Sequence, residues 1–389
     1  MTFFKDMTLS TVFAGGVTVL VGFTSSLALV FQAAQASGAD AAQMASWVWA
    51  IGLGMGVTCF GLSWRYRMPV VTAWSTSGAA MLIISVHGVP MAEVIAAFVM
   101  SSLLVCLVGF SGLFERFMDR VPLPLAAGML AGVLLRLGLD VFVVMSTQLL
   151  LPLVMVLVYL LAMRWWPRYA VVLTMLVGGG LAAWQGQVHL QDIDWQWAHP
   201  VWVTPSFTMA GFISLALPFF IVNMASQNIP GVASMRANHF HPPLSPVIGW
   251  IGVVNLVLAP FGAFSVNLAA ITAAICSGPE AHQDPSKRYT AAMSAGVFYL
   301  MSGLAGASMV SVFAAFPKAL VTVIAGIALF GTISNAMATA LQDVQQRQAA
   351  FITLAVTASG FSLWGISSAF WGLVAGLVAW MLAHKPPAS

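Results

Sequence analysis

Hydroxyl and amide side chains interrupt two apolar stretches of this chain in the same way. "PVVTAWSTSGAA" starts at Pro69 and "PFGAFSVNLAAITAAI" at Pro260, and in each a Pro or Pro/Gly break precedes a polar half-helix. Two half-helices starting near the bilayer midplane would direct free N–H groups and positive dipole ends at one place. The pattern indicates an anion site, with helix packing by small residues as the alternative. The residues concerned are Trp74, Ser75, Thr76 and Ser77, expected in a first helical turn, and Phe264, Ser265, Asn267 and Leu268.

A third stretch, "FISLALPFFIVNMASQNIPGVASMR", brings amides to membrane depth between Pro218 and Pro230, which allow kinks. Buried amides without partners are costly, so these must face other helices or a wet cavity. An early apolar run repeats the design, with a polar patch beside an aromatic ring. Contacts that merely hold helices together are the simpler explanation. The candidate residues are Asn223, Ser226, Gln227 and Asn228 in the third stretch and Phe23 and Thr24 in the early run.

Ionisable residues cluster after the second half-helix, in "SGPEAHQDPSKRY". No acid lies in the middle of the polar stretches, although proton coupling usually needs a titratable group near the substrate path. Glu280 and His282 are the nearest candidates for that role, together with Asp284. A solvated loop would equally explain the cluster.

The composition requires a membrane. Of 389 residues, 60% are hydrophobic and 6% are charged, whereas soluble domains carry about 25% charged residues. Long unbroken apolar runs predict an all-α polytopic membrane protein in contact with the lipid bilayer. The run from Leu9 to Ala34 is too long for a signal peptide and is expected to be the first span. Cys59, Cys106 and Cys276 lie in apolar runs as packing residues.

Motifs for other functions are missing from the sequence. It has no phosphate loop, no metal-spaced His/Cys cluster and no nucleophile with a partnered base. We therefore expect no enzymatic activity, no cofactor, no metal and no nucleic-acid partner.

About fourteen spans are expected, and the basic residues orient them. With both termini in the cytoplasm, twelve Lys and Arg residues fall inside and only Arg136 and Lys318 outside, a strong positive-inside bias. The expected spans are 9–34, 44–64, 69–86, 91–113, 122–139, 141–163, 169–186, 207–229, 244–261, 264–278, 288–313, 318–340, 348–365 and 367–384.

The two halves of the chain resemble each other. "PLPLAAGMLAGVLL" from Pro122 matches "PKALVTVIAGIAL" from Pro317, and the two polar half-helices share the offset of about 194 residues. Seven spans per repeat would invert the second copy, with discontinuous spans 3 and 10 at the repeat interface, as in secondary transporters. The expected repeats are 1–190 and 205–389. A chance likeness between Ala/Gly-rich helices is the alternative.

These motifs together resemble a known family. "MASQNIPGVASMR", "FSVNLAAITAAICSGPEAH" followed by "DPSKRY", and "PVVTAWSTSGAA" are similar to the benzoate/proton symporters, the BenE-type permeases, over essentially the whole chain. More distantly the chain resembles the uracil permease and sulfate/anion transporters. That resemblance implies seven-plus-seven inverted spans, a core domain (1–113 plus 205–315) and a gate domain (118–190 plus 316–385). Where uracil-permease-like proteins place glutamates, this chain has Ser226, Gln227, Val266 and Asn267.

The resemblance implies a function. It implies import of benzoate or a similar aromatic carboxylate with a proton across a bacterial inner membrane, and it allows a homodimer. The N–H groups of 75–77 and 267–269 would bind the carboxylate, and Phe23, Trp74 or Phe264 would cover the ring. The alternatives are a transporter of a nucleobase, sulfate or dicarboxylate, an anion channel, and, with least support, a membrane enzyme.

Overall fold

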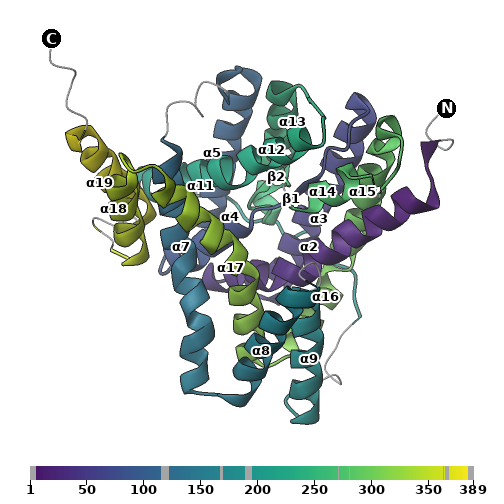
Figure 1. The fold of residues 1–389 in the computed structure, drawn as a ribbon, viewed down its shortest axis with the longest axis horizontal. Coiled ribbons are helices and arrows are strands. Elements are labelled where there is room, and N and C mark those ends of the chain that lie inside the picture. Colours follow the sequence, from purple (N-terminus) through teal and green to yellow (C-terminus); the bar gives the residue numbers. More distant parts are fainter. Residues whose placement is uncertain are drawn as a thin grey trace.

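The computed structural model describes residues 6–114, 122–166, 170–188, 195–269, 271–279, 281–361, 363 and 368–383. Nearly all secondary structure in this part of the chain is helical (Figure 1). Six of its helical segments are individually long and apolar enough to cross a membrane. The prediction of a helical membrane protein is confirmed, while the count of fourteen spans stays a prediction.

The first half of the chain contains seven α-helices, a short 3-10 helix (Val144–Ser146) and a short strand among its described residues. Local signals set several of the boundaries: Thr8 and Asp40 each form a capping box at a helix start, and the Ser75 side chain caps another. The elements are α2 (Leu9–Ala36), α3 (Ala41–Tyr66), β1 (Thr72–Trp74), α4 (Thr76–Ser85), α5 (Met91–Phe110), α7 (Leu123–Val143), α8 (Leu150–Trp165) and α9 (Ala170–Trp184).

The second half opens with a broken helix. Its pieces are α10 (Met209–Gly211), a π-helical turn (Phe212–Ala216), α11 (Leu217–Asn223), a second π-helical turn (Met224–Asn228) and α12 (Ile229–Ala237). Pro218 and Pro230 follow the two turns and cannot donate an N–H to the helix ladder, so each favours a local change of hydrogen bonding. The remaining elements are α13 (Leu244–Leu258), β2 (Val266–Leu268), α14 (Ile271–Ser277), α15 (Tyr289–Leu304), α16 (Gly306–Ala314), α17 (Lys318–Gln342), α18 (Arg347–Ala358) and α19 (Ser368–Ala383).

β1 and β2 form a two-stranded antiparallel ladder in the middle of the molecule. Ala73 pairs with Asn267, and the flanking pairs are Thr72 with Leu268 and Trp74 with Val266. Beyond both ends, the Ser75 N–H donates to the Ser265 carbonyl (3.0 Å) and the Ala269 N–H to the Val71 carbonyl (2.9 Å). The register is symmetric about the central pair, whose members are 194 residues apart. A two-fold axis through the central pair would exchange residues that are 194 positions apart. It would leave this register unchanged, because it maps each outer pair onto the other.

The helix pairs around the ladder repeat the same symmetry. α3 packs on α15 and α5 packs on α13. A Cβ on Gly52 would lie 2.5 Å from Gly303 Cα, and one on Gly109 would lie 2.4 Å from Gly249 N. Both pairs therefore need glycine for close backbone approach. A separate group of helices consists of α7, α17, α18 and α19 (Figure 1). This group contacts the helices beside the ladder at two places, where α17 packs on α2 and α7 packs on α4.

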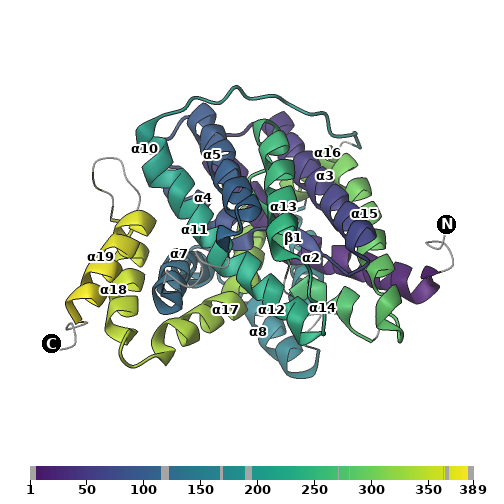
Figure 2. The same ribbon diagram turned by 90° about the horizontal axis from the view of Figure 1, so that it is seen from above.

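The segment 195–208 crosses the ends of α5, α13 and α15 as an extended strap (Figure 2). Its N–H groups donate to three separate elements: Ala198 to the Leu304 carbonyl at the end of α15, Val203 to Pro260, and Ser206 to Ala92 in α5, each at 2.9 Å. The strap thus ties helices from both halves of the chain into one body.

Two expected helix starts are wrong by a few residues. Trp74 lies in β1 and Ser75 is the N-cap, so α4 begins at Thr76. Asn267 lies in β2, and α14 begins at Ile271. The physical reason is that the extended segments pair with each other across the molecule, and this pairing satisfies their backbone groups before either helix starts.

Candidate functional site

The start of α4 carries a directional chain of hydroxyl groups. The Gly78 N–H donates to Ser75 Oγ (2.8 Å), and Ser75 Oγ lies 3.2 Å from Ser77 Oγ. Ser77 Oγ lies 2.5 Å from Ser226 Oγ, which donates to the Val222 carbonyl (2.6 Å). The Ser226 hydroxyl proton is used in the bond to that carbonyl, so Ser226 can only accept from Ser77. Ser77 therefore donates to Ser226 and accepts from Ser75.

The second π-helical turn supplies an amide to the same place. Gln227 Nε2 donates to Thr76 Oγ1 and Ser77 Oγ, both at 3.3 Å. In an ordinary α-helix, successive side chains diverge by about 100°. The widened turn lets Ser226, Gln227 and Asn228 all reach the discontinuous spans. π-turns are frequent at functional sites.

Asn228 connects the broken helix to β2. Its Nδ2 donates to Asn267 Oδ1 (2.9 Å), and its Oδ1 accepts the Leu268 N–H (3.0 Å). Asn267 Nδ2 then donates to Ser265 Oγ (2.6 Å). The N–H groups of Leu268 and Ala269, which we expected to bind a carboxylate, are therefore already bonded within the protein, the latter to Val71. That part of the predicted anion site is wrong.

An aromatic group borders the ladder on the α2 side. The Phe23 and Trp74 rings meet edge to face with centroids 4.7 Å apart, and Trp74 Nε1 donates to Ser26 Oγ (2.9 Å). Tyr299 of α15 completes the group, with its ring centroid 6.1 Å from that of Phe23. We call Phe23, Trp74 and Tyr299 the aromatic group.

Phe264 belongs to a second cluster. Its ring lies 6.0 Å from that of Trp47 and 6.3 Å from that of Phe98. Its expected role over a substrate ring stays a prediction that none of these contacts supports. Thr24 is part of α2, but its side chain lies outside the described residues.

Asn223 is a predicted site residue whose side-chain amide is not hydrogen-bonded to any described residue. Its side chain is 1% exposed, and among the described residues neither Oδ1 nor Nδ2 has a hydrogen-bond partner. A Cβ added to Gly78 would lie 2.8 Å from Asn223 Oδ1, so the amide lies against the first turn of α4. A buried amide in this state is available to a ligand or to water.

A second set of polar residues holds the ladder in place, and the sequence analysis missed it. Asn255 of α13 bonds both the N–H and the C=O of Val266 (2.8 and 2.7 Å). On the other strand, Thr72 Oγ1 lies 2.6 Å from Thr58 Oγ1, and its N–H donates to Cys59 Sγ (3.1 Å). The only signal in the sequence is a lone polar residue within each apolar run, which is common in membrane helices.

The loop after α14 is held by Arg288. This side chain is 8% exposed and donates to the carbonyls of Ser277 (2.8 Å), His282 (2.7 Å) and Gln283 (3.4 Å). A guanidinium at the end of a helix also complements its dipole. The Arg288 side chain thus closes the loop onto α14.

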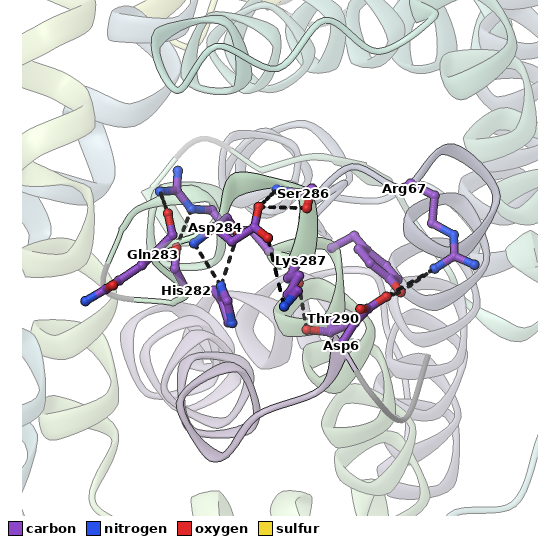
Figure 3. Close-up of polar contacts among 10 residues, drawn as sticks. Asp6, Arg67, His282, Gln283, Asp284, Ser286, Lys287 and Thr290 are labelled. Atoms are coloured by element: carbon purple, nitrogen blue, oxygen red, sulfur yellow. Dashed lines mark hydrogen bonds and ion pairs between the residues drawn. The ribbon is translucent and has the colours of Figure 1, made fainter. Parts of the chain in front are cut away.

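His282 and Asp284 form a tight turn within this loop (Figure 3). His282 Nδ1 accepts the Asp284 N–H at 2.9 Å. The Asp284 carboxylate accepts from the Ser286 N–H and hydroxyl and lies 3.9 Å from Lys287 Nζ. The bonds from Ser286 hold the pKa of this exposed carboxyl below its usual value. Glu280 lies outside the described residues.

A third polar cluster lies nearby, at the start of α15 (Figure 3). The Tyr289 hydroxyl donates to Asp6 Oδ2 at 2.8 Å. Arg67 at the end of α3 bonds the same hydroxyl, lies 3.7 Å from Asp6 and places its guanidinium over the Tyr289 ring. These contacts join α3, α15 and the segment before α2.

The comparisons with known proteins agree with this geometry. The family model described as "Benzoate membrane transport protein" matches residues 5–382. The chain belongs to the benzoate membrane transport protein family. It is therefore a membrane transporter and not an enzyme.

Two curated relatives match almost end to end. The "Benzoate membrane transport protein" of Acinetobacter baylyi is 36% identical over 99% of this chain and 98% of its own length. The "Inner membrane protein YdcO" of Escherichia coli is 45% identical over 96% of each chain.

Solved structures show the fold that this BenE-family chain shares. The transmembrane domain of the cyanobacterial bicarbonate transporter BicA superposes with a TM-score of 0.59 at 14% identity, covering 95% of this chain and 97% of that one. The murine Slc26a9 anion transporter in its inward-facing state gives 0.58 at 12% identity, covering 97% and 68%. The family and these neighbours together support transport of an anion across a membrane.

Proposed function

We propose that this BenE-family protein is a secondary active transporter that imports benzoate or a similar aromatic carboxylate with a proton across the bacterial inner membrane, with both termini cytoplasmic. The observation that carries the proposal is the neutral hydroxyl–amide network at the start of α4, bordered by aromatic rings. Ser77 and Gln227 are its centre.

In this proposal the carboxylate binds beside the first turn of α4. The first N–H groups of a helix have no partner within it, and Ser75 takes only that of Gly78. The N–H groups of Thr76 and Ser77 and the Asn223 amide would then bind the carboxylate oxygens. Neutral amides do not repel an anion, as glutamates at these positions would.

The aromatic group supplies the rest of the recognition. Phe23 and Trp74 are both more than nine-tenths buried and would contact the substrate ring through their faces and edges. An inorganic anion has no apolar part that could pack against these rings. The substrate class that fits both halves of the site is therefore a carboxylate attached to an aromatic ring.

The negative charge of the substrate is the reason to propose that a proton is transported with it. Benzoic acid is almost fully ionised at neutral pH, so its import against a negative interior needs a cation. We propose Glu280 with His282 as the proton carriers. His282 Nδ1 is an acceptor for the Asp284 N–H, so its protonation would break that bond and release the turn.

Movement of a core past a gate would expose the site to each side in turn. We propose the division 1–113 plus 205–315 for the core and 118–190 plus 316–385 for the gate. The strap supports it, because the three backbone bonds described above run to core elements. Such rigid-body movement around a fixed site is the common mechanism of transporters built from inverted repeats.

Uptake of radiolabelled benzoate into proteoliposomes with an inward proton gradient tests the proposal. We expect saturable uptake that an uncoupler abolishes, a strong loss in Gln227→Ala, and normal uptake in the control Gln348→Ala, whose side chain is exposed. Glu280→Gln and His282→Gln should retain benzoate binding and lose acceleration by the gradient. Uptake insensitive to the uncoupler would refute symport, and non-saturable flux would indicate a channel. Absence of uptake and binding in the wild type would refute the substrate.

A further inference from the structure

The Tyr299 hydroxyl is deeply buried, yet no described residue forms a hydrogen bond with it. Tyr299 is 1% exposed, and within the described part of the chain its Oη forms no hydrogen bond. Buried polar atoms of native proteins are nearly always bonded, so an exception requires an explanation. A phenol both donates and accepts a hydrogen bond, and either would serve a ligand.

The hydroxyl lies between α2 and the start of α14. A Cβ added to Gly22 would lie 3.3 Å from Tyr299 Oη and 3.9 Å from Thr272 Cγ2. Thr272 is in the first turn of α14, and Phe23, the neighbour of Gly22 in the chain, contacts the Tyr299 ring. The hydroxyl is thus at the edge of the aromatic group, on the side of the second half-helix.

The half-helix of the first repeat, α4, has a comparable group beside it. Asn223 is equally buried, its amide has no hydrogen-bond partner among the described residues, and it lies against the first turn of α4. A buried polar group that no described residue hydrogen-bonds thus lies beside each half-helix start, Asn223 beside α4 and Tyr299 beside α14. The Trp74 indole N–H is already bonded to Ser26, which leaves the Tyr299 hydroxyl as the polar function of the aromatic group that a ligand can use.

We propose that Tyr299 determines which ring substituents the transporter accepts, by hydrogen bonding a hydroxyl group on the ring of the bound aromatic carboxylate. This inference rests on the proposed function, in which the carboxylate end binds beside α4 and Asn223. The ring then lies along Phe23 and Trp74, and its substituent meets Tyr299. A site that hydrogen-bonds a substituent discriminates against analogues that lack it, because its own polar group stays unpaired.

Competition binding tests this assignment. Benzoate, the hydroxybenzoate isomers and the methylbenzoates are used to displace radiolabelled benzoate from purified wild type, Tyr299→Phe and Tyr159→Phe. Tyr159 is the control because it too is a buried tyrosine packed on an aromatic ring, that of Phe330, but in α8. In Tyr299→Phe we expect the preference for at least one hydroxybenzoate over benzoate to fall by about threefold to tenfold, the effect of one hydrogen bond. Benzoate affinity and the Tyr159→Phe ratios should not change.

The alternatives give different results. If all affinities fall together in Tyr299→Phe, the residue is structural and the specificity assignment is wrong. If every ratio equals that of the wild type, the hydroxyl does not contact the substituent and the assignment is also wrong. If the wild type binds no aromatic carboxylate, the proposed function itself fails, and this result is distinguishable because it does not depend on the variants.

Discussion

Replacing Asn228 with alanine should destabilise the whole site, because this side chain joins the broken helix to β2. Asn228 is fully buried. Its removal leaves the Leu268 N–H and Asn267 Oδ1 without their partners, which now lie at 3.0 and 2.9 Å. Each buried group left unpaired costs about 1–3 kcal/mol, so the free energy of unfolding should fall by about 2–6 kcal/mol. At about 2 °C per kcal/mol, the melting temperature should fall by roughly 4–12 °C.

The buried thiols provide the assay. Cys59, Cys106 and Cys276 are all free and buried, so a thiol-reactive fluorescent dye labels them when the detergent-purified protein opens on heating. Asn335→Ala is the matched control because Asn335 is exposed in α17, where substitutions change stability by less than about 0.5 kcal/mol. A melting temperature of Asn228→Ala within 1 °C of that of the control would refute the reasoning about these bonds.

A double substitution separates the pair from its surroundings. Removing Asn267 as well eliminates the orphaned acceptor and leaves the Leu268 N–H as the orphaned donor, so the loss in Asn228→Ala/Asn267→Ala should be smaller than the sum of the single losses. Additive losses would mean that the two amides do not act together. The comparison requires no knowledge of the substrate.

Three further predictions concern the backbone and the charged loop. Gly262→Ala should lower stability by about 2–6 kcal/mol in the same dye assay, because φ is +96° and the new Cβ would lie 1.8 Å from Trp47 Cδ1; wild-type stability would contradict this. Arg288→Lys keeps a trypsin site but loses the guanidinium bonds to three carbonyls, so trypsin should cut the loop faster, and equal rates would contradict the role of Arg288. The bonds from Ser286 depress the pKa of the Asp284 carboxyl below 3.8, so they stabilise the fold above that pH and the contribution is lost as pH falls through the lower folded value. The stability difference between wild type and Asp284→Asn should therefore be constant from pH 7 to 5 and shrink below pH 3.8, and a difference that grows on acidification would contradict the sign.

The discontinuous spans could be predicted from the sequence because their signals are local. A proline or glycine break, an apolar run and a few hydroxyls each act within one or two helical turns. The offset of 194 residues also survives in the sequence, and the pairing of Ala73 with Asn267 has the same spacing. The polar residues of the second π-helical turn could be found for a similar reason, since amides at membrane depth must have partners.

What the sequence did not reveal depends on contacts between distant segments. Strand pairing moved Trp74 and Asn267 out of the helices, and no local propensity indicates which segment will lie opposite. In the sequence Tyr299 is an ordinary aromatic residue of an apolar helix, and only the structure shows its hydroxyl buried with no hydrogen bond to a described residue. The role of Arg288 was not predicted, because its acceptors are backbone carbonyls and only the folded loop brings them close to the guanidinium.

The symmetry of the backbone contrasts with the asymmetry of the side chains it carries. With the 194-residue offset of the Ala73–Asn267 pair, Trp74 corresponds to Leu268 and Thr72 to Val266, so two nearly equivalent scaffolds support different chemistry. The first repeat contributes the α4 hydroxyls and an indole, and the second contributes amides, serine hydroxyls and the Tyr299 phenol. Backbone symmetry suits a site that must open to both sides of the membrane, whereas the proposed substrate, an aromatic carboxylate, has unlike ends and needs unlike surroundings. Because Asn228 and the ladder fasten both discontinuous spans together, a ligand bound to either one is bound to the core as a unit.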